Sequence, residues 1–548
     1  MSKLKLTIPS GIITTHPISA RELIKNVPEF FLTTKSTGVF PRIVPTGEML
    51  ALANPPEGTE FANREPIITA GPYGMGNAVG LSNPGKREAR KEILNSEIPK
   101  ERIRASIFGR NPEEFAEVAE TLENCVSALE ENDSCPHSKG HGISIGADPE
   151  AVRLCAEAVT SRVNIPVWVK FGLMPNLLDS VKAALEGGAY GIVLLNTEGP
   201  YPYTIDGNPI LYNGVGGMSG PSLFPKLIAS VKMVRKRFGT IPISACGGIQ
   251  GAREINELRE LEVYEYGIGT ALAGMTWREL VEYFKTVVKD CERGTDNASG
   301  LLKKIDMTLK EAVIKKVHKD SCDFGIYETD RAIDASPGQF AFLFLPGKFM
   351  PNGKPGEKPF SILDNDPLTF AVQTRGYFTR VFNGLEEGEG FYFRGPYGQS
   401  PKIEEGRDVV LVGGGCGIAG LYFFAKKFSE TNRIITLLGA KDKNHIPYLR
   451  EFEKVSEVKV ATEDGSLGKK GLVKDLLNEF SFKAESYFFN CGPRTMVESV
   501  LPFELIVSAP ERVYSSVDYM TRCGVGICGS CIDEEGRRTC KEGPFMNP

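Results

Sequence analysis

The feature that most constrains the fold is a regular alternation of strand-like and helix-like segments through the first half of the chain. Apolar runs such as IPVWVKFG (165–172), GIVLLNT (191–197) and IPISACGGI (241–249) are separated by amphipathic stretches such as NLLDSVKAALEGG and LFPKLIASVKMVRKRFG. Nearly continuous apolar runs are typical of parallel strands that are buried on both faces. A β–α repeat of about 300 residues predicts one (β/α)8 TIM barrel, with an open doubly wound sheet as the alternative.

Polar residues and glycines at the ends of successive predicted strands favour the barrel. They are Lys170, Asn196, Gly247–Gly248 and Gly269–Thr270. In a barrel the carboxyl ends of all strands meet at one face, where active sites form. These residues are therefore expected to converge there.

The pattern changes after a polar stretch, ERGTDNASG (292–300). Segments with two-residue periodicity, such as GQFAFLFLPG and GEGFYFRGPYG, then predict an antiparallel β-barrel. The strand DVVLVGG follows and runs into the glycine-rich GGGCGIAG (413–420) before a helical stretch. Such a turn can bring a helix N-terminus close to a pyrophosphate, although a tight turn without a ligand is the alternative. The predicted multidomain α/β chain has its domains at 1–298, 304–405, 406–510 and 511–548.

Four cysteines near the C-terminus have the spacing C-x4-C-x2-C-x8-C: Cys523, Cys528, Cys531 and Cys540. This spacing matches the ligand pattern of a plant-type [2Fe–2S] cluster. A structural zinc site is the alternative, but zinc sites favour two C-x2-C pairs separated by a longer loop. The sequence therefore predicts a redox protein.

Composition excludes several classes of function. The 548 residues carry a net charge of −5 and no basic block, so nucleic-acid binding is not expected. The N-terminus lacks a signal-peptide pattern, and no apolar run is long enough to span a bilayer. The other eight of the twelve cysteines are scattered singly, as in reduced proteins. A cytoplasmic location without membrane attachment is expected.

Residues from about 305 onwards resemble the electron-transfer subunit of the NAD-dependent (class 1B) dihydroorotate dehydrogenases, within the ferredoxin-reductase family. The matching stretches are PGQF (337–340), KPFSI (358–362), GPYG (395–398), GGGCGIAG, TEDGSLGKKG (462–471), CGP (491–493) and the four cysteines. The resemblance implies an FAD-binding barrel, an NAD domain and a terminal [2Fe–2S] segment. Lys358 departs from the usual arginine of the flavin motif and loses its fork geometry. The implied contacts are Lys358, Pro359, Phe360, Ser361, Gly376 and Thr379 for FAD, and Gly413, Gly415, Gly417, Cys491, Gly492 and Pro493 for NAD.

The first half resembles the catalytic subunit of the same enzymes, an FMN-binding barrel, so both components are fused here. The matching stretches are TKST (34–37), NAVGLSNPG (77–85), NDSCPH (132–137), VKFG (169–172), LLNT (194–197), GGMSGP (216–221), CGGI (246–249) and GIGTA (267–271). The resemblance implies that Lys170 places positive charge beside the flavin N1–O2 edge. It also implies a homo-oligomer, a dimer through the barrel. The implied FMN contacts are Ser10, Gly11, Lys35, Ser36, Asn132, Lys170, Gly220, Gly247, Gly248, Gly269 and Thr270.

Cys135 is the expected catalytic base. Oxidation of a dihydropyrimidine removes a proton from C5 and a hydride from C6, so a base is needed on the side of the substrate away from the flavin. A buried inert thiol is the alternative, but Asn132, Ser134 and Pro136 place Cys135 in a polar loop. We therefore expect Cys135 to take the proton.

The substrate is expected to be dihydroorotate. NAVGLSNPG resembles the carboxylate-binding loop of the family, with Asn77, the amides of Gly80 and Leu81, and Lys35 around the anion. His137 stands where that family usually has Asn, and Cys-Pro-His resembles dihydropyrimidine dehydrogenases, whose substrates are uracil and thymine. A dihydropyrimidine dehydrogenase of that kind and an electron-transfer flavoprotein that serves a partner are the alternatives. The expected substrate contacts are Lys35, Asn77, Gly80, Leu81, Asn132, His137, Asn196 and Thr197.

Overall fold

The computed structural model describes residues 4–41, 66–71, 74–135, 142–319, 323–483, 485–517 and 519–548. The chain divides into two compact units. Unit 1 comprises residues 1–59, 65–306 and 525–538, and unit 2 comprises 60–64, 307–524 and 539–548. Among the described residues, no helix is long and apolar enough to cross a membrane.

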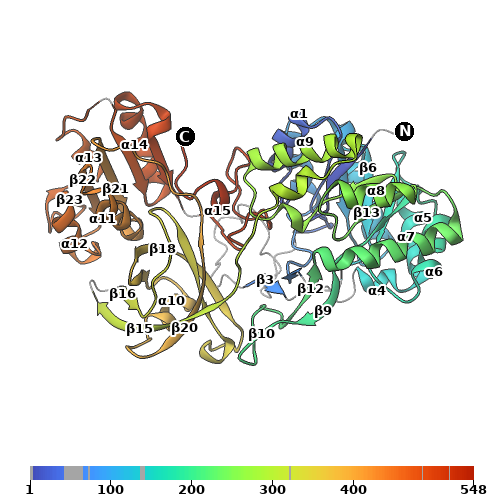
Figure 1. The fold of residues 1–548 in the computed structure, drawn as a ribbon, viewed down its shortest axis with the longest axis horizontal. Coiled ribbons are helices and arrows are strands. Elements are labelled where there is room, and N and C mark those ends of the chain that lie inside the picture. The colour runs from blue at the N-terminus through green and yellow to red at the C-terminus, as the bar shows by residue number, and fades with distance from the viewer. Residues whose placement is uncertain are drawn as a thin grey trace. The chain divides into compact units, whose positions relative to one another are not determined.

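Unit 1 is built on parallel strands that close into an eight-stranded barrel in the order β1-β14-β13-β8-β7-β6-β5-β2 (Figure 1). Each strand is paired with its predecessor in the repeat, as the β–α pattern requires, and the pair β1–β14 closes the barrel. The predicted TIM barrel is confirmed. The strand bounds are β1 (Leu6–Ile8), β2 (Phe30–Thr33), β5 (Ile103–Ile107), β6 (Ala128–Asn132), β7 (Val167–Phe171), β8 (Gly191–Leu194), β13 (Ile243–Cys246) and β14 (Glu265–Gly267).

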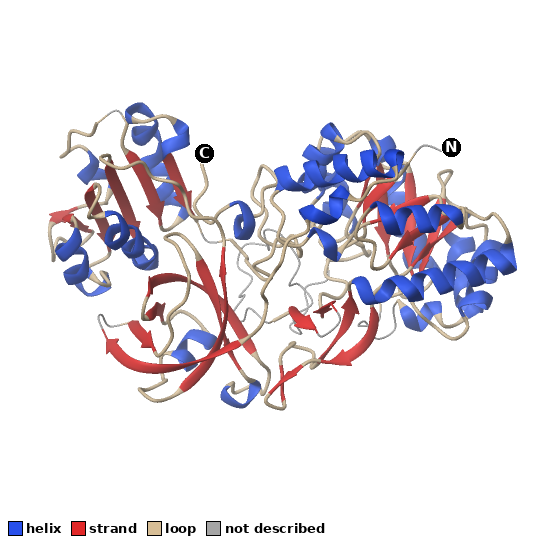
Figure 2. Cartoon of the chain, in the orientation of Figure 1, coloured by secondary structure: helices blue, strands red, loops and turns tan. Residues whose placement is uncertain are grey.

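Amphipathic helices cover the outside of this barrel (Figure 2). In α9 the Thr276 side chain and Glu279 form a reciprocal capping box at the N-terminus, and Gly294 ends the helix in the left-handed conformation. Its apolar face, with Leu280, Phe284 and Val287 among others, is buried. The helices are α1 (Arg21–Asn26), α2 (Lys86–Asn95), α3 (Pro112–Leu122), α4 (Ile143–Gly146), α5 (Pro149–Thr160), α6 (Leu177–Glu186), α7 (Phe224–Phe238), α8 (Ala252–Glu260) and α9 (Trp277–Arg293).

Unit 1 also carries a small antiparallel sheet in the order β3-β4-β12-β9 and a hairpin, β10–β11. In the sheet, Asn77 at the end of β4 is paired with Gly217 of β12. This small sheet is formed by the loops of the barrel, and it holds Asn77 at the site described below. The bounds are β3 (Ile68–Gly71), β4 (Gly74–Asn77), β9 (Glu198–Pro202), β10 (Thr204–Ile205), β11 (Asn208–Pro209) and β12 (Val215–Ser219).

The first part of unit 2 is a closed antiparallel barrel in the order β15-β16-β19-β18-β17-β20. Its core contains the inward-facing Leu343, Leu345, Phe370 and Phe391, and every residue of β17 is buried. The predicted antiparallel barrel is confirmed. The bounds are β15 (Lys310–Lys319), β16 (Phe324–Thr329), β17 (Phe340–Leu345), β18 (Gly356–Asn365), β19 (Leu368–Gln373), α10 (Tyr377–Phe382) and β20 (Gly390–Tyr397).

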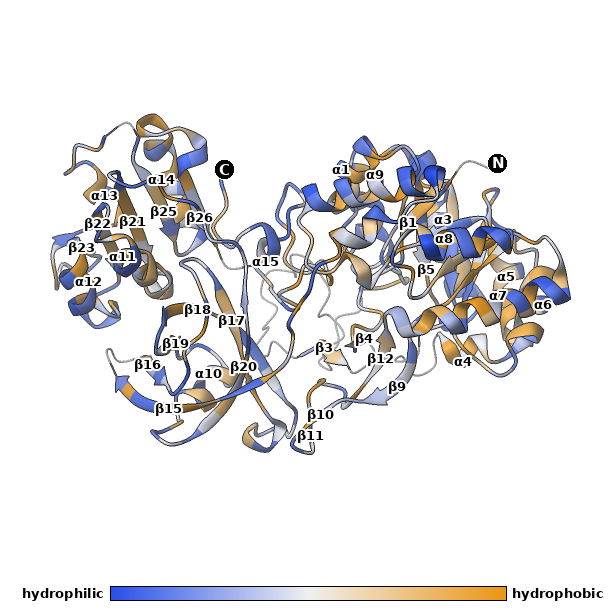
Figure 3. Cartoon of the chain, in the orientation of Figure 1, coloured by the Kyte–Doolittle hydropathy of each residue, from blue (hydrophilic) through white to orange (hydrophobic). Residues whose placement is uncertain are grey.

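The second part of unit 2 is a parallel sheet in the order β24-β23-β22-β21-β25-β26. Along β21, Val409 and Leu411 belong to one apolar cluster and Val410 and Val412 to another, so both faces of the strand are buried (Figure 3). The bounds are β21 (Asp408–Gly414), α11 (Tyr422–Phe428), β22 (Arg433–Ala440), α12 (Leu449–Val455), β23 (Glu457–Thr462), β24 (Lys469–Lys470), α13 (Lys474–Leu477), β25 (Tyr487–Cys491), α14 (Arg494–Val507), β26 (Val513–Ser516) and α15 (Thr539–Glu542).

Candidate active site

A pocket of about 1110 Å³ opens at the carboxyl ends of the strands of unit 1. Its lining contains every sequence-predicted FMN or substrate contact except His137, which lies outside the described residues. Residues from widely separated loops therefore meet at one face, as barrel closure requires. The predicted residues in the lining are Ser10, Gly11, Lys35, Ser36, Asn77, Gly80, Leu81, Asn132, Cys135, Lys170, Asn196, Thr197, Gly220, Gly247, Gly248, Gly269 and Thr270.

Cys135 lies just beyond the end of β6 and is 6% exposed. The sequence predicts a polar loop and argues against burial, but the residue is buried while still lining the pocket. The chain passes close to it again at Gly142, whose φ is +55° and whose missing Cβ would come within 2.6 Å of the Cys135 backbone nitrogen. The Ile143 amide also donates to the Cys135 carbonyl oxygen at 3.1 Å. The backbone of Cys135 is thus packed against Gly142 and hydrogen-bonded to Ile143.

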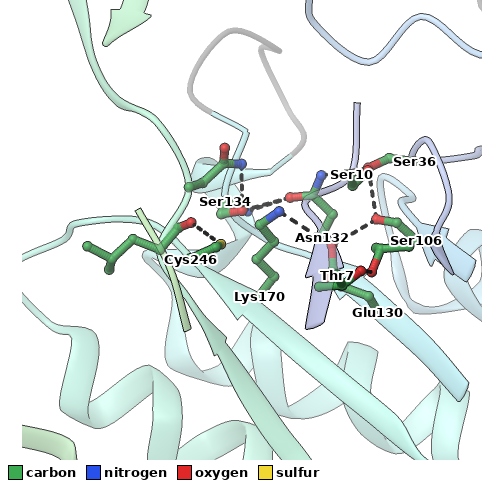
Figure 4. A network of polar contacts seen from close by, with 12 residues as sticks. Thr7, Ser10, Ser36, Ser106, Glu130, Asn132, Ser134, Lys170 and Cys246 are labelled. Atoms are coloured by element: carbon green, nitrogen blue, oxygen red, sulfur yellow. Dashed lines mark hydrogen bonds and ion pairs between the residues drawn. The ribbon is translucent and has the colours of Figure 1, made fainter. Parts of the chain in front are cut away.

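A network of short polar side chains fixes the floor of the pocket (Figure 4). The Asn132 amide donates to Ser36 Oγ at 2.8 Å, and its Oδ1 accepts from Ser134 Oγ at 2.7 Å. Asn196 Nδ2 donates to the same Ser134 Oγ at 2.9 Å. Ser36 Oγ also lies 2.9 Å from Ser106 Oγ. Ser36 and Ser134 therefore fix the orientation of Asn132, and Ser134 also fixes that of Asn196.

Lys35 comes from the loop after β2, and Asn77 comes from the end of β4 in the small sheet. Lys35 Nζ donates to the Gly80 carbonyl oxygen at 3.0 Å. Asn77 Nδ2 donates to the Gly217 carbonyl oxygen at 3.2 Å, which leaves its second N–H for another acceptor. Together they place an ammonium group and an amide donor beside Gly80 and Leu81, a donor set that suits a carboxylate.

The glycines after β13 and β14 suit a phosphate. Gly248 has φ +79°, and a Cβ there would come within 2.7 Å of the Phe224 nitrogen, so only glycine lets the backbone approach so closely. Gly269 and Thr270 begin the short 3-10 helix Thr270–Leu272. Loops after the seventh and eighth strands, with the N-terminus of a short helix, form the usual phosphate site of TIM barrels. The described residues therefore fit the phosphate of FMN.

Lys170 projects from β7 into the pocket and is 3% exposed. Its Nζ lies 3.5 Å from Glu130 Oε1, and that oxygen also accepts from Ser106 Oγ at 3.2 Å. Burial alone lowers the pKa of the Lys170 ammonium, but the Glu130 carboxylate raises it, with smaller contributions from Cys246 and Cys135. The pKa of Lys170 ends above its ordinary value. A charged lysine is therefore maintained inside the barrel.

Two further carboxyl groups of β6 and its C-terminal end point away from the pocket. Glu131 and Asp133 are fully buried, and each lies close enough to the other to affect its pKa. Burial raises the pKa of Asp133 to about 7. Burial and the neighbouring Asp133 raise the pKa of Glu131. The pair also raises the pKa of the Cys155 thiol on α5, after the larger effect of burial.

Sequence reasoning missed part of the lining, most notably Ile527 and Cys528 from the cysteine-rich segment. The Ile13 amide donates to the Ile527 carbonyl oxygen at 2.7 Å, and Thr15 Oγ1 donates to the Cys528 carbonyl oxygen at 2.7 Å. Arg538 is buried and donates to the Gly526 and Met275 carbonyl oxygens, at 2.9 Å each. No local signal relates these segments. The other missed residues are mostly apolar: Pro9, Ile12, Ile68, Met75, Val79, Leu195, Ser219, Leu223, Cys246 and Ile249.

Unit 2 contains a pocket lined by the predicted flavin motif, of about 1270 Å³. Lys358, Pro359, Phe360 and Ser361 of β18 and Thr379 of α10 line it. The predicted NAD contacts Gly417, Cys491 and Gly492 line this pocket as well, whereas Gly376 does not. Basic and aromatic residues and glycine backbone surround the space, which fits a flavin nucleotide.

A neighbouring pocket of unit 2, of about 1520 Å³, lies at the carboxyl ends of β21, β22 and β23. Gly415 and Pro493 of the predicted NAD contacts line it, together with Lys441, His445 and Glu463. Gly413 lines neither pocket. Ligands of open α/β sheets bind at this edge, so the position suits a dinucleotide.

The four cysteines of the predicted cluster are buried: Cys523, Cys528, Cys531 and Cys540. Among the described residues, no three His, Cys, Asp or Glu side chains are grouped around one metal ion. A [2Fe–2S] cluster needs two thiolates for each of its two irons. The loop glycines Gly524, Gly526 and Gly529 all have positive φ, as a chain that curls tightly requires. The segment keeps the residue types that such a cluster needs.

Comparison with known proteins gives matches to both halves of the chain. The family model described as dihydroorotate dehydrogenase matches residues 55–282. A probable dihydroorotate dehydrogenase B (NAD(+)), electron transfer subunit, of Methanocaldococcus jannaschii is 36% identical over 237 residues, which are 42% of this chain and 87% of that protein. A dihydroorotate dehydrogenase B (NAD(+)), catalytic subunit, of Pyrococcus horikoshii is 40% identical over 211 residues, which are 38% of this chain and 68% of that protein.

Among solved structures, a chain of an NADH-dependent reduced ferredoxin-NADP oxidoreductase has a TM-score of 0.38 and 28% identity, covering 43% of this chain and 87% of its own. These two relatives confirm the resemblance to the catalytic and electron transfer subunits that the sequence motifs indicate. The chain belongs to the dihydroorotate dehydrogenase B (NAD(+)) family, with matches to both its catalytic and its electron transfer subunits.

Proposed function

We propose that this protein oxidises dihydroorotate to orotate in unit 1 and passes the electrons to NAD⁺ through unit 2, as a step of pyrimidine biosynthesis. The observation that carries the proposal is the lining of one pocket by a candidate base, two lysines, three asparagines and a glycine cradle. Flavins and NAD are implied by the family. The assignment of FMN to unit 1, of FAD and a [2Fe–2S] cluster to the rest, and of a cytoplasmic location belongs to the proposal.

In this mechanism, bound FMN would supply the hydride acceptor, and the residues of the chain position the substrate and handle its proton. Cys135 takes the proton from C5. Asn132 and Asn196, fixed through Ser134, donate to or accept from the ring amides. The backbone that holds Cys135 at Gly142 and Ile143 keeps the thiol on one side of the substrate.

Selection of dihydroorotate would come from its carboxylate. Lys35, the second N–H of Asn77 and the amides of Gly80 and Leu81 supply donors whose charge-assisted hydrogen bonds contribute about 1.5–3 kcal/mol each. A substrate without the carboxylate offers no acceptor to the second Asn77 N–H or to the amides of Gly80 and Leu81. The site should therefore discriminate strongly against substrates that lack the carboxylate, because a donor left without an acceptor keeps its full desolvation cost.

The test is a steady-state assay with NAD⁺ and dihydroorotate, dihydrouracil or dihydrothymine. We expect dihydroorotate to exceed dihydrouracil in kcat/KM by about two or more powers of ten. Asn77→Ala should narrow that ratio by harming only the carboxylated substrate. A higher kcat/KM for dihydrouracil or dihydrothymine would show that the Cys-Pro-His resemblance is the better guide to the substrate.

Reduction of the flavin in a single turnover tests the base. Cys135→Ser should retain FMN and lower the rate of its reduction by dihydroorotate by orders of magnitude at neutral pH, because a serine hydroxyl loses its proton far less readily than a thiol and supplies far less of the basic form. The Cys155→Ser variant, in which a buried thiol outside the pocket is replaced, is the matched control. A Cys135→Ser rate close to that of the unmodified protein would remove Cys135 from the mechanism.

A reducing compartment is also consistent with the cysteines. The described ones are free of disulfides, including the exposed Cys416 and the partly exposed Cys491. The expected dimer through the barrel stays a prediction, which sedimentation of the purified protein would test.

A further inference from the structure

Glu130 is a buried carboxyl group that belongs to unit 1 but does not line the pocket. It lies on the inward face of β6 and is 2% exposed. Its Oε1 lies 3.5 Å from Lys170 Nζ and accepts a hydrogen bond from Ser106 Oγ at 3.2 Å. Figure 4 shows Glu130 below Lys170, with Ser106 at its side. The carboxylate is therefore fixed by one neighbouring strand and directed at a charge on the other.

Lys170 depends on this carboxylate for its charge. An ammonium group that is removed from water loses its solvation and tends to become neutral unless an opposite charge lies close. The titratable groups that face Lys170 are Glu130 on β6, Cys246 on β13 and Cys135 after β6. Burial raises the pKa of the Cys246 thiol to about 11, and its Sγ donates to the Leu195 carbonyl oxygen at 2.8 Å. Cys246 is thus neutral at neutral pH and cannot replace Glu130.

We propose that Glu130 is a positioning residue that holds Lys170 in place and keeps it charged in both oxidation states of the flavin that unit 1 would bind. It acts through Lys170 and does not itself touch the substrate or the cofactor. The inference rests on the proposed FMN site of unit 1. With Glu130 in place, no proton enters or leaves Lys170 when the flavin is reduced.

If the Glu130 carboxylate is removed, we expect a change in the number of protons taken up when the flavin is reduced. In Glu130→Gln the buried Lys170 is neutral while the flavin is oxidised, and it takes up a proton when the flavin gains negative charge. Each proton taken up with two electrons adds about 30 mV per pH unit to the slope of the FMN midpoint potential, since a tenfold change for a two-electron couple is 29.6 mV. The slope should therefore increase by about 30 mV per pH unit relative to the unmodified protein.

The experiment is a spectroelectrochemical titration of the holoenzyme between pH 6 and pH 9. The FMN component is identified as the flavin signal that responds to added orotate, the proposed product. If no flavin signal responds to orotate, the proposed function is wrong. That outcome is distinguished from failure of the Glu130 proposal because it is measured first, on the unmodified protein. Glu131→Gln is the matched control, because it removes a buried carboxyl from the next residue on the opposite face of β6, and it should keep the original slope.

Two more variants keep the inference falsifiable if Glu130→Gln does not retain FMN. Glu130→Asp withdraws the carboxylate by one methylene group, so the steeper slope should appear only in the upper part of the pH range. The double variant Glu130→Gln/Lys170→Met lacks the titrating amine and should return to the original slope. An unchanged slope in both Glu130 variants, or a steep slope that persists without Lys170, would overturn the role of Glu130.

Discussion

The paired carboxyl groups of Glu131 and Asp133 predict that the barrel loses stability as the pH rises. Both side chains are fully buried and lie next to each other. Burial raises the pKa of Asp133 from 3.8 to about 7. In the folded state Asp133 therefore retains a proton that the unfolded chain has already released, and the unfolded state binds fewer protons between about pH 4 and pH 7.

The magnitude follows from linkage. Stability falls with rising pH wherever the folded state binds more protons, by about 1.4 kcal/mol per pH unit for one proton. The raised pKa of Asp133 therefore costs folding free energy on the order of a few kcal/mol above pH 7, and none of it below pH 4. Asp133→Asn removes the ionising group while keeping its size. We expect the variant to be more stable than the unmodified protein at pH 8 by on the order of a few kcal/mol, with little difference at pH 4.

Tryptophan fluorescence during urea unfolding measures the stability of unit 1 alone. The chain has two tryptophans, Trp168 and Trp277, and both belong to the barrel. The urea midpoint of Asp133→Asn should exceed that of the unmodified protein by an amount that grows from pH 5 to pH 8. Asp179→Asn, which replaces an exposed carboxylate on α6, should keep the original pH dependence. A constant difference at every pH would show that Asp133 is not protonated in the folded barrel.

Two further predictions concern the electron path. Cys528→Ser should abolish the visible absorption of the [2Fe–2S] cluster and block NAD⁺ reduction by dihydroorotate, while an artificial acceptor still reoxidises the flavin of unit 1; an intact cluster spectrum would contradict the ligand assignment. Gly415→Val should raise the KM for NAD⁺ without changing flavin reduction by substrate, because the missing Cβ at φ +55° meets no protein atom and a side chain would enter the dinucleotide pocket. Unchanged NAD⁺ kinetics would place the nicotinamide nucleotide elsewhere.

The pocket of unit 1 could be predicted from the sequence because barrel closure converts strand ends into neighbours. Asn132, Lys170 and Asn196 each follow or end a recognisable apolar strand, so their meeting requires only that the parallel strands close. The same rule could not supply Ile527 and Cys528. They enter the lining through hydrogen bonds to Ile13 and to Thr15, which is 513 residues away from Cys528. Contacts of that range depend on the packing of whole segments and have no local pattern.

The run Glu130-Glu131-Asn132-Asp133 shows a second limit, which concerns charge. Alternate residues of a strand face opposite sides, so Glu130 and Asn132 point into the barrel and Glu131 and Asp133 point outwards. Three acidic residues in four positions are typical of a solvated segment, yet Glu130, Glu131 and Asp133 are all buried. Glu130 faces the oppositely charged Lys170, whereas burial raises the pKa of both Glu131 and Asp133. Adjacent residues of one type thus acquire opposite electrostatic roles, because the partner that decides the role comes from another strand.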